Sequence, residues 1–183
     1  MDFLQAVHHY AKECHGDQQR KYEAGPYIIH LERVRDLCQE YTNDQSMLAA
    51  ALLHDVLEDT PVTKHEMKDH LSSLTSEEQA QRIVSLVVEL TDVFIKSNYP
   101  QWNRRRRKQK EVERLSNVSA DAQTIKYADI IDNSLTILNA TDDFARVYLL
   151  EARALVKGMK KGKEDLRQRA IDTIEKCLME SRQ

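Results

Sequence analysis

The stretch that decides the fold is residues 47–60, which read MLAAALLHDVLEDT. Its first seven residues, 47–53, are apolar on every side of a helix, which predicts a helix buried at the centre of the domain. Four ionisable residues follow within one and a half turns: His54, Asp55, Glu58 and Asp59. Burying unpaired charge at the end of such a helix is costly, so something must compensate it. A divalent metal ion is the simplest candidate.

The spacing of these four residues indicates how they could act together. His54 and Glu58 lie four residues apart in the sequence, and so do Asp55 and Asp59. On one continuous helix they would form two rows, each spanning one turn of about 5.4 Å. A metal ion bound by His54 and Asp55 would then have two carboxylates one turn away, at a distance suited to a bound water.

The rest of the chain repeats the helical period of apolar residues. Its 183 residues include four glycines and three prolines, too few for a turn-rich sandwich or barrel or for a Gly-rich nucleotide-binding fold. We therefore expect an all-α fold: one compact domain over residues 1–183, a helical bundle of about eight to ten helices. The expected helices lie at residues 3–14, from 30, from 45, from 63, 75–90, 102–115, 120–139, 142–158 and 163–181.

Composition limits the classes of function. With 27 basic and 30 acidic residues the net charge is −3, so no general attraction to nucleic acid or membranes is expected. The three cysteines, Cys14, Cys38 and Cys177, are odd in number and widely spaced, which favours buried free thiols. No apolar run is long enough for a membrane span and the first residues lack a signal-peptide pattern, so we expect a cytoplasmic protein.

Two further motifs offer ligands of the same chemical kind. His30 follows a predicted loop that contains Gly25 and Pro26, and Asp129 lies among isoleucines in the run KYADIIDN, residues 126–133. Asn133 comes four residues after Asp129, so both lie on the same face of a helix.

The order His, then His-Asp, then Asp is the pattern of HD domains. The local sequence resembles the hydrolase domain of the Rel/Spo-homologue family, in particular its small alarmone hydrolases. The motifs that carry the resemblance are Arg20-Lys21, residues 25–30, residues 51–60 and residues 126–129, and the match extends in order from about residue 3 to about residue 160. Leu31 stands where the family usually has proline, and Ile130 where it usually has a basic residue.

The resemblance implies an HD-type bundle that removes the 3′-pyrophosphate from alarmone nucleotides, either guanosine tetra- and pentaphosphate or their adenosine analogues. It implies a manganese ion held by His30, His54, Asp55 and Asp129. Two imidazoles and two carboxylates suit such an ion. It also implies that Glu58 and Asp59 activate the attacking water, and that Arg20, Lys21, Asn133 and Tyr148 bind the nucleotide. Which base is preferred is open at this point, as is the oligomeric state.

Other functions compete with this interpretation. An HD phosphohydrolase could act on 5′-nucleotides or NADPH, and a module with the same ligands could bind alarmones without turnover. The charged residues 54–59 could also be a solvated helix end. The basic run Arg104 to Lys108 points all round its helix, which favours a solvated surface over nucleic-acid binding. Alternatively, part of that run, with Lys96 and Lys110, attracts substrate phosphates.

Several residues have ordinary structural interpretations. Trp102 is expected to be a core anchor rather than a stacking surface, and Tyr148 is a packing residue by its pattern alone. The remaining histidines are expected at the surface or at helix caps: His8, His9, His15, His65 and His70.

Overall fold

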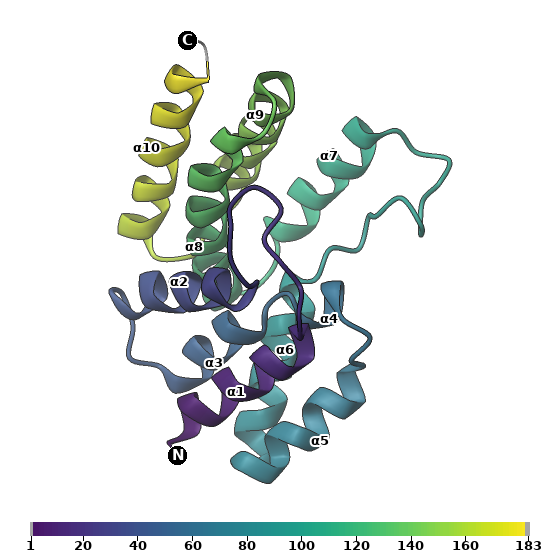
Figure 1. The fold of residues 1–183 in the computed structure, drawn as a ribbon, viewed down its shortest axis with the longest axis vertical. Helices are drawn as coiled ribbons and strands as arrows, with labels where there is room; N and C mark the ends of the chain where they lie inside the picture. Colours follow the sequence, from purple (N-terminus) through teal and green to yellow (C-terminus); the bar gives the residue numbers. More distant parts are fainter. Residues whose placement is uncertain (1, 182–183) are drawn as a thin grey trace. The chain divides into compact units, whose positions relative to one another are not determined.

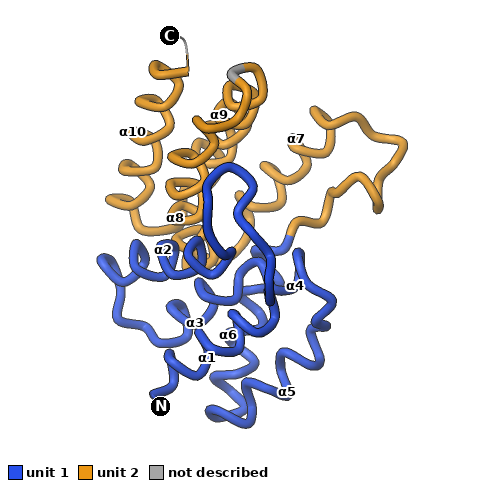
Figure 2. The backbone as a smooth tube through the Cα atoms, viewed as in Figure 1, with its two compact units in different colours: residues 1–91 blue, residues 92–183 orange. Residues whose placement is uncertain are grey.

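The computed structural model describes residues 2–181, which form α-helices joined by turns and loops. The predicted all-α class is confirmed. The chain divides into two compact units, residues 1–91 and residues 92–183 (Figure 2). The expectation that residues 1–183 act as one domain remains a prediction.

Unit 1, residues 1–91, is built around the helix that the sequence places at its centre. The helices are α1 (Phe3–His15), α2 (Ile28–Gln39), α3 (Gln45–Leu53), α4 (Val56–Asp59), α5 (Lys64–Leu74) and α6 (Glu77–Leu90) (Figure 1). Every residue of α3 from Ser46 to Leu53 is buried, and α3 packs against α1, α2 and α6. An element apolar on all sides needs neighbours on all sides, and α3 has them.

Side-chain caps fix where these helices begin. The Asp44 carboxylate accepts hydrogen bonds from the backbone N–H groups of Ser46 and Met47 and so caps α3. Thr63 and Glu66 form a capping box at the start of α5, where a helix was expected. The hydroxyl of Ser76 caps α6 by accepting a hydrogen bond from the backbone N–H of Gln79.

The helix through residues 47–60 is interrupted, which corrects the prediction of two rows on one continuous helix. α3 ends at Leu53, and α4 restarts at Val56 with Asp55 as its N-cap residue. The imidazole Nδ1 of His54 lies 2.8 Å from the Ala51 carbonyl oxygen. A continuing helix would use that carbonyl for the amide of Asp55, so the His54 side chain competes with the next helical turn.

Unit 2, residues 92–183, contains α7 (Arg104–Leu115), α8 (Ala120–Thr136), the 3₁₀ turn η1 (Ile137–Asn139), α9 (Asp142–Gly158) and α10 (Glu164–Glu180). α8 packs against α10 and α9, and α7 packs against α9 (Figure 1). α7 begins two residues later than expected, with Asn103 as its cap.

The cysteines mostly agree with the expectation of buried free thiols. All three cysteines are free thiols; Cys38 and Cys177 are buried, whereas Cys14 is only half-buried. No helix in the described part of the chain has the length and hydrophobicity of a membrane span.

Candidate metal and catalytic site

Three of the four predicted ligands lie together in unit 1. One ligand atom from each of His30, His54 and Asp55 lies within 4.8 Å of the others. The Nε2 atoms of His30 and His54 are 3.5 Å and 3.2 Å from Oδ2 of Asp55. Both imidazoles are buried, whereas the Asp55 side chain is 18% exposed. The cluster therefore has buried nitrogen ligands and one carboxylate with access to solvent.

Local structure orients the two histidine side chains. His30 lies in the first turn of α2, after a loop in which Gly25 has φ +132°, a conformation that other residues rarely adopt. His54 caps the C-terminus of α3. Because the Ala51 carbonyl can only accept, His54 Nδ1 carries the proton there, and Nε2 presents its lone pair to the cluster.

Tyr27 supports the carboxylate from a second direction. Its hydroxyl donates to Oδ2 of Asp55 over 2.6 Å. The Tyr27 ring stacks on His15, with centroids 4.6 Å apart, and meets the His30 ring edge-on at 5.7 Å. An aromatic residue thus connects the end of α1 to both the imidazole and the carboxylate of the cluster.

The donor set fits a divalent metal ion. Imidazole nitrogens and a carboxylate are ligands for ions such as manganese, iron and zinc, and the His54 ring already has the backbone partner typical of a metal-binding histidine. The three atoms converge within the distance that one ion can bridge. The interpretation of residues 54–59 as a solvated helix end is wrong for His54, which is 2% exposed.

The two candidate catalytic carboxylates have a different environment. Glu58 and Asp59 lie on the short helix α4, and both are exposed. Oδ2 of Asp59 accepts a hydrogen bond of 3.2 Å from the side-chain amide of Gln18, in the loop after α1. Exposed carboxylates can accept protons from solvent-borne groups, which the buried ligands cannot do as readily.

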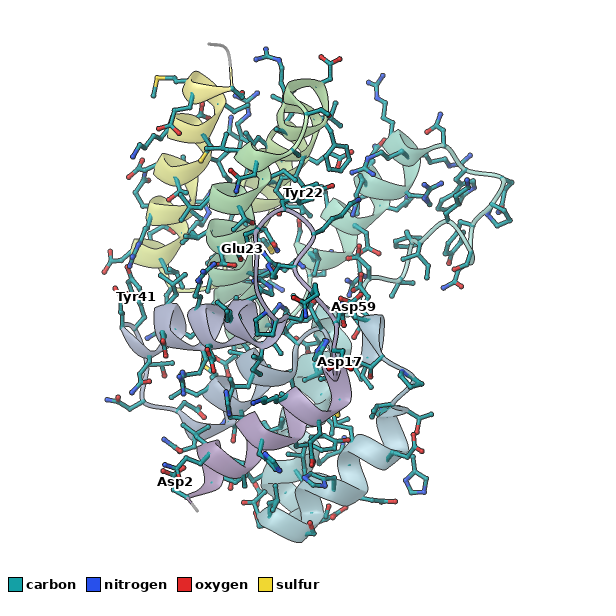
Figure 3. All side chains as sticks on the ribbon, in the orientation of Figure 1. Asp2, Asp17, Tyr22, Glu23, Tyr41 and Asp59 are labelled. Carbon is teal, nitrogen blue, oxygen red and sulfur yellow. The ribbon has the colours of Figure 1, made fainter. Side chains whose placement is uncertain are left out.

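The loop at residues 16–27 carries the predicted nucleotide-binding pair. The Arg20 side chain is held by Glu23, with Nε 3.1 Å from Oε1, and its guanidinium carbon lies 5.6 Å from the Tyr27 ring centre. Lys21 lies over the ring of Tyr22 at 5.1 Å. Figure 3 shows Tyr22 and Glu23 at the far end of this loop. The structure brings Arg20 to the tyrosine that supports the cluster; its role with a nucleobase remains a prediction.

Asp129, the fourth predicted ligand, belongs to α8 in unit 2. Its side chain is buried and accepts from Lys126 Nζ at 2.8 Å and from Asn133 Nδ2 at 2.5 Å. The predicted common face of Asp129 and Asn133 is confirmed. Tyr148, on α9, is half-buried.

The basic run of α7 lies at the surface as expected, with Arg104, Arg105 and Arg106 exposed, but several of its charges have partners. Arg104 forms a bidentate ion pair with Glu151, and Lys108 reaches Asp92 at 3.2 Å. Arg106 stacks over Trp102 at 4.4 Å. Internal partners in unit 2 therefore neutralise or shield much of its charge.

Two single-residue expectations are wrong. Trp102 is not part of the buried core; it is half-exposed and stacks with Phe94 and Tyr99 in the loop before α7. His15 is neither a surface nor a cap residue, because it is 6% exposed and packs on Tyr27. Its helical spacing from Val7 and Ala11, which are also buried on α1, was the signal that could have revealed it.

Comparison with known proteins places the chain in a family. Residues 8–146 match the family described as HD domain. A solved structure described as a metazoan ortholog of SpoT that hydrolyses ppGpp superimposes with a TM-score of 0.79, covering 96% of this chain and 95% of its own, at 24% sequence identity. At that identity the likeness establishes the shared fold.

Sequence relatives give the same grouping. The guanosine-3′,5′-bis(diphosphate) 3′-pyrophosphohydrolase MESH1 of Xenopus tropicalis is 31% identical over 159 residues, covering 82% of this chain and 81% of the relative. MESH1 of Mus musculus is 32% identical over 158 residues, covering 82% and 80%. A guanosine-3′,5′-bis(diphosphate) 3′-pyrophosphohydrolase of Aquifex aeolicus is 37% identical over 94 residues, and the chain spans 13% of the length of that relative. The chain therefore belongs to the HD-domain family, among the homologues of the Rel/Spo proteins.

Proposed function

We propose that the protein is a metal-dependent hydrolase that removes the 3′-pyrophosphate from alarmone nucleotides, guanosine 3′,5′-polyphosphates or their adenosine analogues. The observation that carries this proposal is the convergence of His30, His54 and Asp55 within 4.8 Å beside a helix that bears two exposed carboxylates. Relatives of nearly the same length carry the corresponding name. The proposal treats residues 1–183 as one catalytic domain, since the family match extends over both units.

The metal we propose is manganese, with His30, His54 and Asp55 as ligands and Asp129 as a further carboxylate. The assignment of Asp129 rests on its sequence context and on its burial, because a buried carboxylate needs cationic partners. Lys126 supplies one such partner at 2.8 Å. A bound ion of this kind lowers the pKa of its water and offsets negative charge on phosphate oxygens.

In this proposal, different side chains have different roles in the reaction. We assign Glu58 and Asp59 as the groups that accept the proton from the attacking water. Water attacks the phosphorus bonded to the 3′ oxygen, the bond between phosphorus and the 3′ oxygen breaks, and the departing oxygen takes the proton that the carboxylate accepted. The products are pyrophosphate and a nucleotide with a free 3′ hydroxyl. Tyr27 holds Asp55 by its hydrogen bond, so the carboxylate keeps one orientation.

Basic and polar side chains account for the binding of the nucleotide in this proposal. Arg20 and Lys21 present cationic groups beside the tyrosine rings of their own loop, and planar guanidinium groups stack well on nucleobases. Asn133 and Tyr148 are assigned to the ribose and base. We also propose that the protein acts in the cytoplasm and that it has no nucleic-acid partner.

The decisive experiment offers the purified protein, with and without Mn²⁺, a panel of nucleotides. The panel contains guanosine and adenosine 3′,5′-polyphosphates, ordinary 5′-nucleotides and NADPH, and products are identified by mass. We expect pyrophosphate and a 5′-phosphorylated nucleotide from the alarmones in the presence of Mn²⁺. Preferred cleavage of 5′-nucleotides or NADPH, or tight alarmone binding without product, would overturn the proposal.

Asp129→Ala tests the fourth ligand in the same assay. We expect loss of Mn²⁺ binding measured by calorimetry together with loss of turnover. Asp121→Ala, on the first turn of the same helix, is the matched control. If Asp129→Ala binds Mn²⁺ as the wild type does, Asp129 is not a ligand.

A further inference from the structure

Gln18 connects a proposed catalytic carboxylate to a buried histidine. Its side-chain nitrogen donates to Oδ2 of Asp59 over 3.2 Å, and its side-chain oxygen lies 2.8 Å from Nδ1 of His15. The two contacts use opposite ends of one amide. A carboxylate can only accept at neutral pH, so the nitrogen must face Asp59 and the oxygen must face His15. His15 Nδ1 therefore carries a proton and donates to Gln18.

This orientation of the amide is the only one that satisfies both neighbours. If the amide were flipped, its oxygen would face the Asp59 carboxylate, and two acceptors would lie in contact without a proton between them. Asp59 and His15 thus select the same arrangement of Gln18 from two sides. A hydrogen bond to a charged acceptor is also stronger than one between neutral groups.

The histidine end of this connection is rigid. His15 is 6% exposed, lies in the last turn of α1 and stacks on Tyr27 with an interplanar angle of 15°. The Gln18 backbone is held as well, because its amide donates to the His15 carbonyl over 3.0 Å and its carbonyl accepts from Tyr27 N–H over 2.8 Å. The side chain that reaches Asp59 therefore starts from a fixed base.

The carboxylate end is the one that needs support. Asp59 is exposed at the end of the four-residue helix α4, so packing does not fix its side chain. A catalytic group must be held within a narrow range of its productive geometry, and hydrogen bonds from neighbouring side chains provide this where packing cannot.

We propose that Gln18 is a positioning residue for Asp59. The side-chain amide of Gln18 holds the Asp59 carboxylate in place by connecting it to His15. This inference rests on the proposed function for the role of Asp59 in catalysis, whereas the connection itself rests on the two hydrogen bonds of Gln18. His15 also stacks on Tyr27, whose hydroxyl donates to Asp55. The His15–Tyr27 pair therefore helps to orient both the candidate ligand Asp55 and the candidate catalytic group Asp59.

The kinetic test uses Gln18→Met, which keeps the length of the side chain and removes both hydrogen bonds. We expect kcat for alarmone cleavage to fall about 10- to 100-fold with KM changed by less than about twofold, as for loss of orientation rather than of binding. Gln18→Glu, which keeps an acceptor for His15 but places a like charge beside Asp59, is expected to be at least as impaired. Gln19→Met is the matched control, because the Gln19 amide donates to the Asp17 carbonyl instead.

A double-mutant cycle separates positioning from a general structural effect. In an Asp59→Ala background, Gln18→Met should cause no further loss of kcat, since Gln18 acts through Asp59. The proposal is overturned if Gln18→Met lowers kcat equally in both backgrounds. It is also overturned if Gln18→Met raises KM and leaves kcat unchanged. Thermal unfolding of each variant shows whether the fold is retained.

A measurement that does not require turnover examines the connection itself. In ¹H–¹⁵N spectra of the full chain without metal, the side-chain amide signals of Gln18 should shift in Asp59→Ala, while those of Gln19 stay in place. Unchanged Gln18 signals would overturn the connection whatever the activity. If the signals shift but the wild type cleaves no alarmone, the proposed function fails and the connection stands.

Discussion

The hydroxyl of Tyr27 donates a hydrogen bond of 2.6 Å to Oδ2 of Asp55, the oxygen that also lies nearest Nε2 of both His30 and His54. One phenol therefore fixes the carboxylate at the point where the two imidazoles converge. Groups that orient a metal ligand in this way typically contribute 10- to 100-fold to metal affinity.

Removing this hydroxyl should weaken metal binding without disturbing the packing of the ring. In Tyr27→Phe the ring can still stack on His15, so we expect the Kd for Mn²⁺, measured by calorimetry, to rise about 10-fold. Tyr41→Phe, beyond the end of α2, is the control and should bind Mn²⁺ as the wild type does. An unaltered affinity in Tyr27→Phe would show that the hydrogen bond has no part in metal binding.

Glu58 should matter for turnover and not for metal binding. Glu58→Gln keeps the shape of the side chain but removes the base that we assign to the attacking water, so kcat should fall by about 10²- to 10⁴-fold. Calorimetry should give the wild-type Kd for Mn²⁺. Glu78→Gln, exposed in the first turn of α6, is the matched control. Full activity in Glu58→Gln would remove Glu58 from the catalytic assignment.

The sequence predicts several helices well because they begin with a local signal. Asp44 and Thr63 cap the helices that follow them as their side-chain chemistry requires. The all-apolar run before His54 predicts the central position of α3, since such a surface must be covered on every side.

What the sequence misses depends on contacts between distant segments or between side chain and backbone. The break at residues 54–55 follows from the bond between His54 Nδ1 and the Ala51 carbonyl, which no periodic pattern reveals. The stack of Tyr27 on His15 likewise depends on the loop that folds back between them. The amide bridge at Gln18 spans 41 residues of sequence to Asp59, so spacing cannot predict it.

The tight approach of the α9–α10 connection to α8 gives a stability prediction. A Cβ added at Gly162 would lie 2.6 Å from Cε2 of Tyr127 and 2.9 Å from the backbone nitrogen of Thr124. Tyr127 cannot move away easily, because it is fully buried and its hydroxyl bonds to the Met159 carbonyl. Gly162→Ala should therefore destabilise the protein by about 1–3 kcal/mol, measured by urea unfolding. Lys160→Ala, exposed in the same connection, should cost less than about 0.5 kcal/mol.

The cap of α3 predicts how stability responds to acid. Burial alone would raise the pKa of Asp44, but hydrogen bonds from Arg82 and from the backbone N–H groups of Met47 and Ser46 outweigh it, so the pKa lies below its ordinary value. A carboxyl group whose pKa is lower in the folded state stabilises the protein above its unfolded pKa, about 3.9, and this contribution is lost as the pH falls through the folded pKa.

Two substitutions at Asp44 separate its charge from its cap. Asn is also a good N-cap residue, so Asp44→Asn should lose only the ion pair with Arg82, about 0.5–1 kcal/mol at pH 7, whereas Asp44→Ala should lose about 1–2 kcal/mol. The difference between wild type and Asp44→Asn should shrink as the pH of urea unfolding is lowered from 5 to about 2.5. Asp69→Asn, whose side chain is 67% exposed on α5, is the control and should show little difference at either pH. A difference at Asp44 that persists at the lowest pH would mean that the carboxylate charge does not stabilise α3.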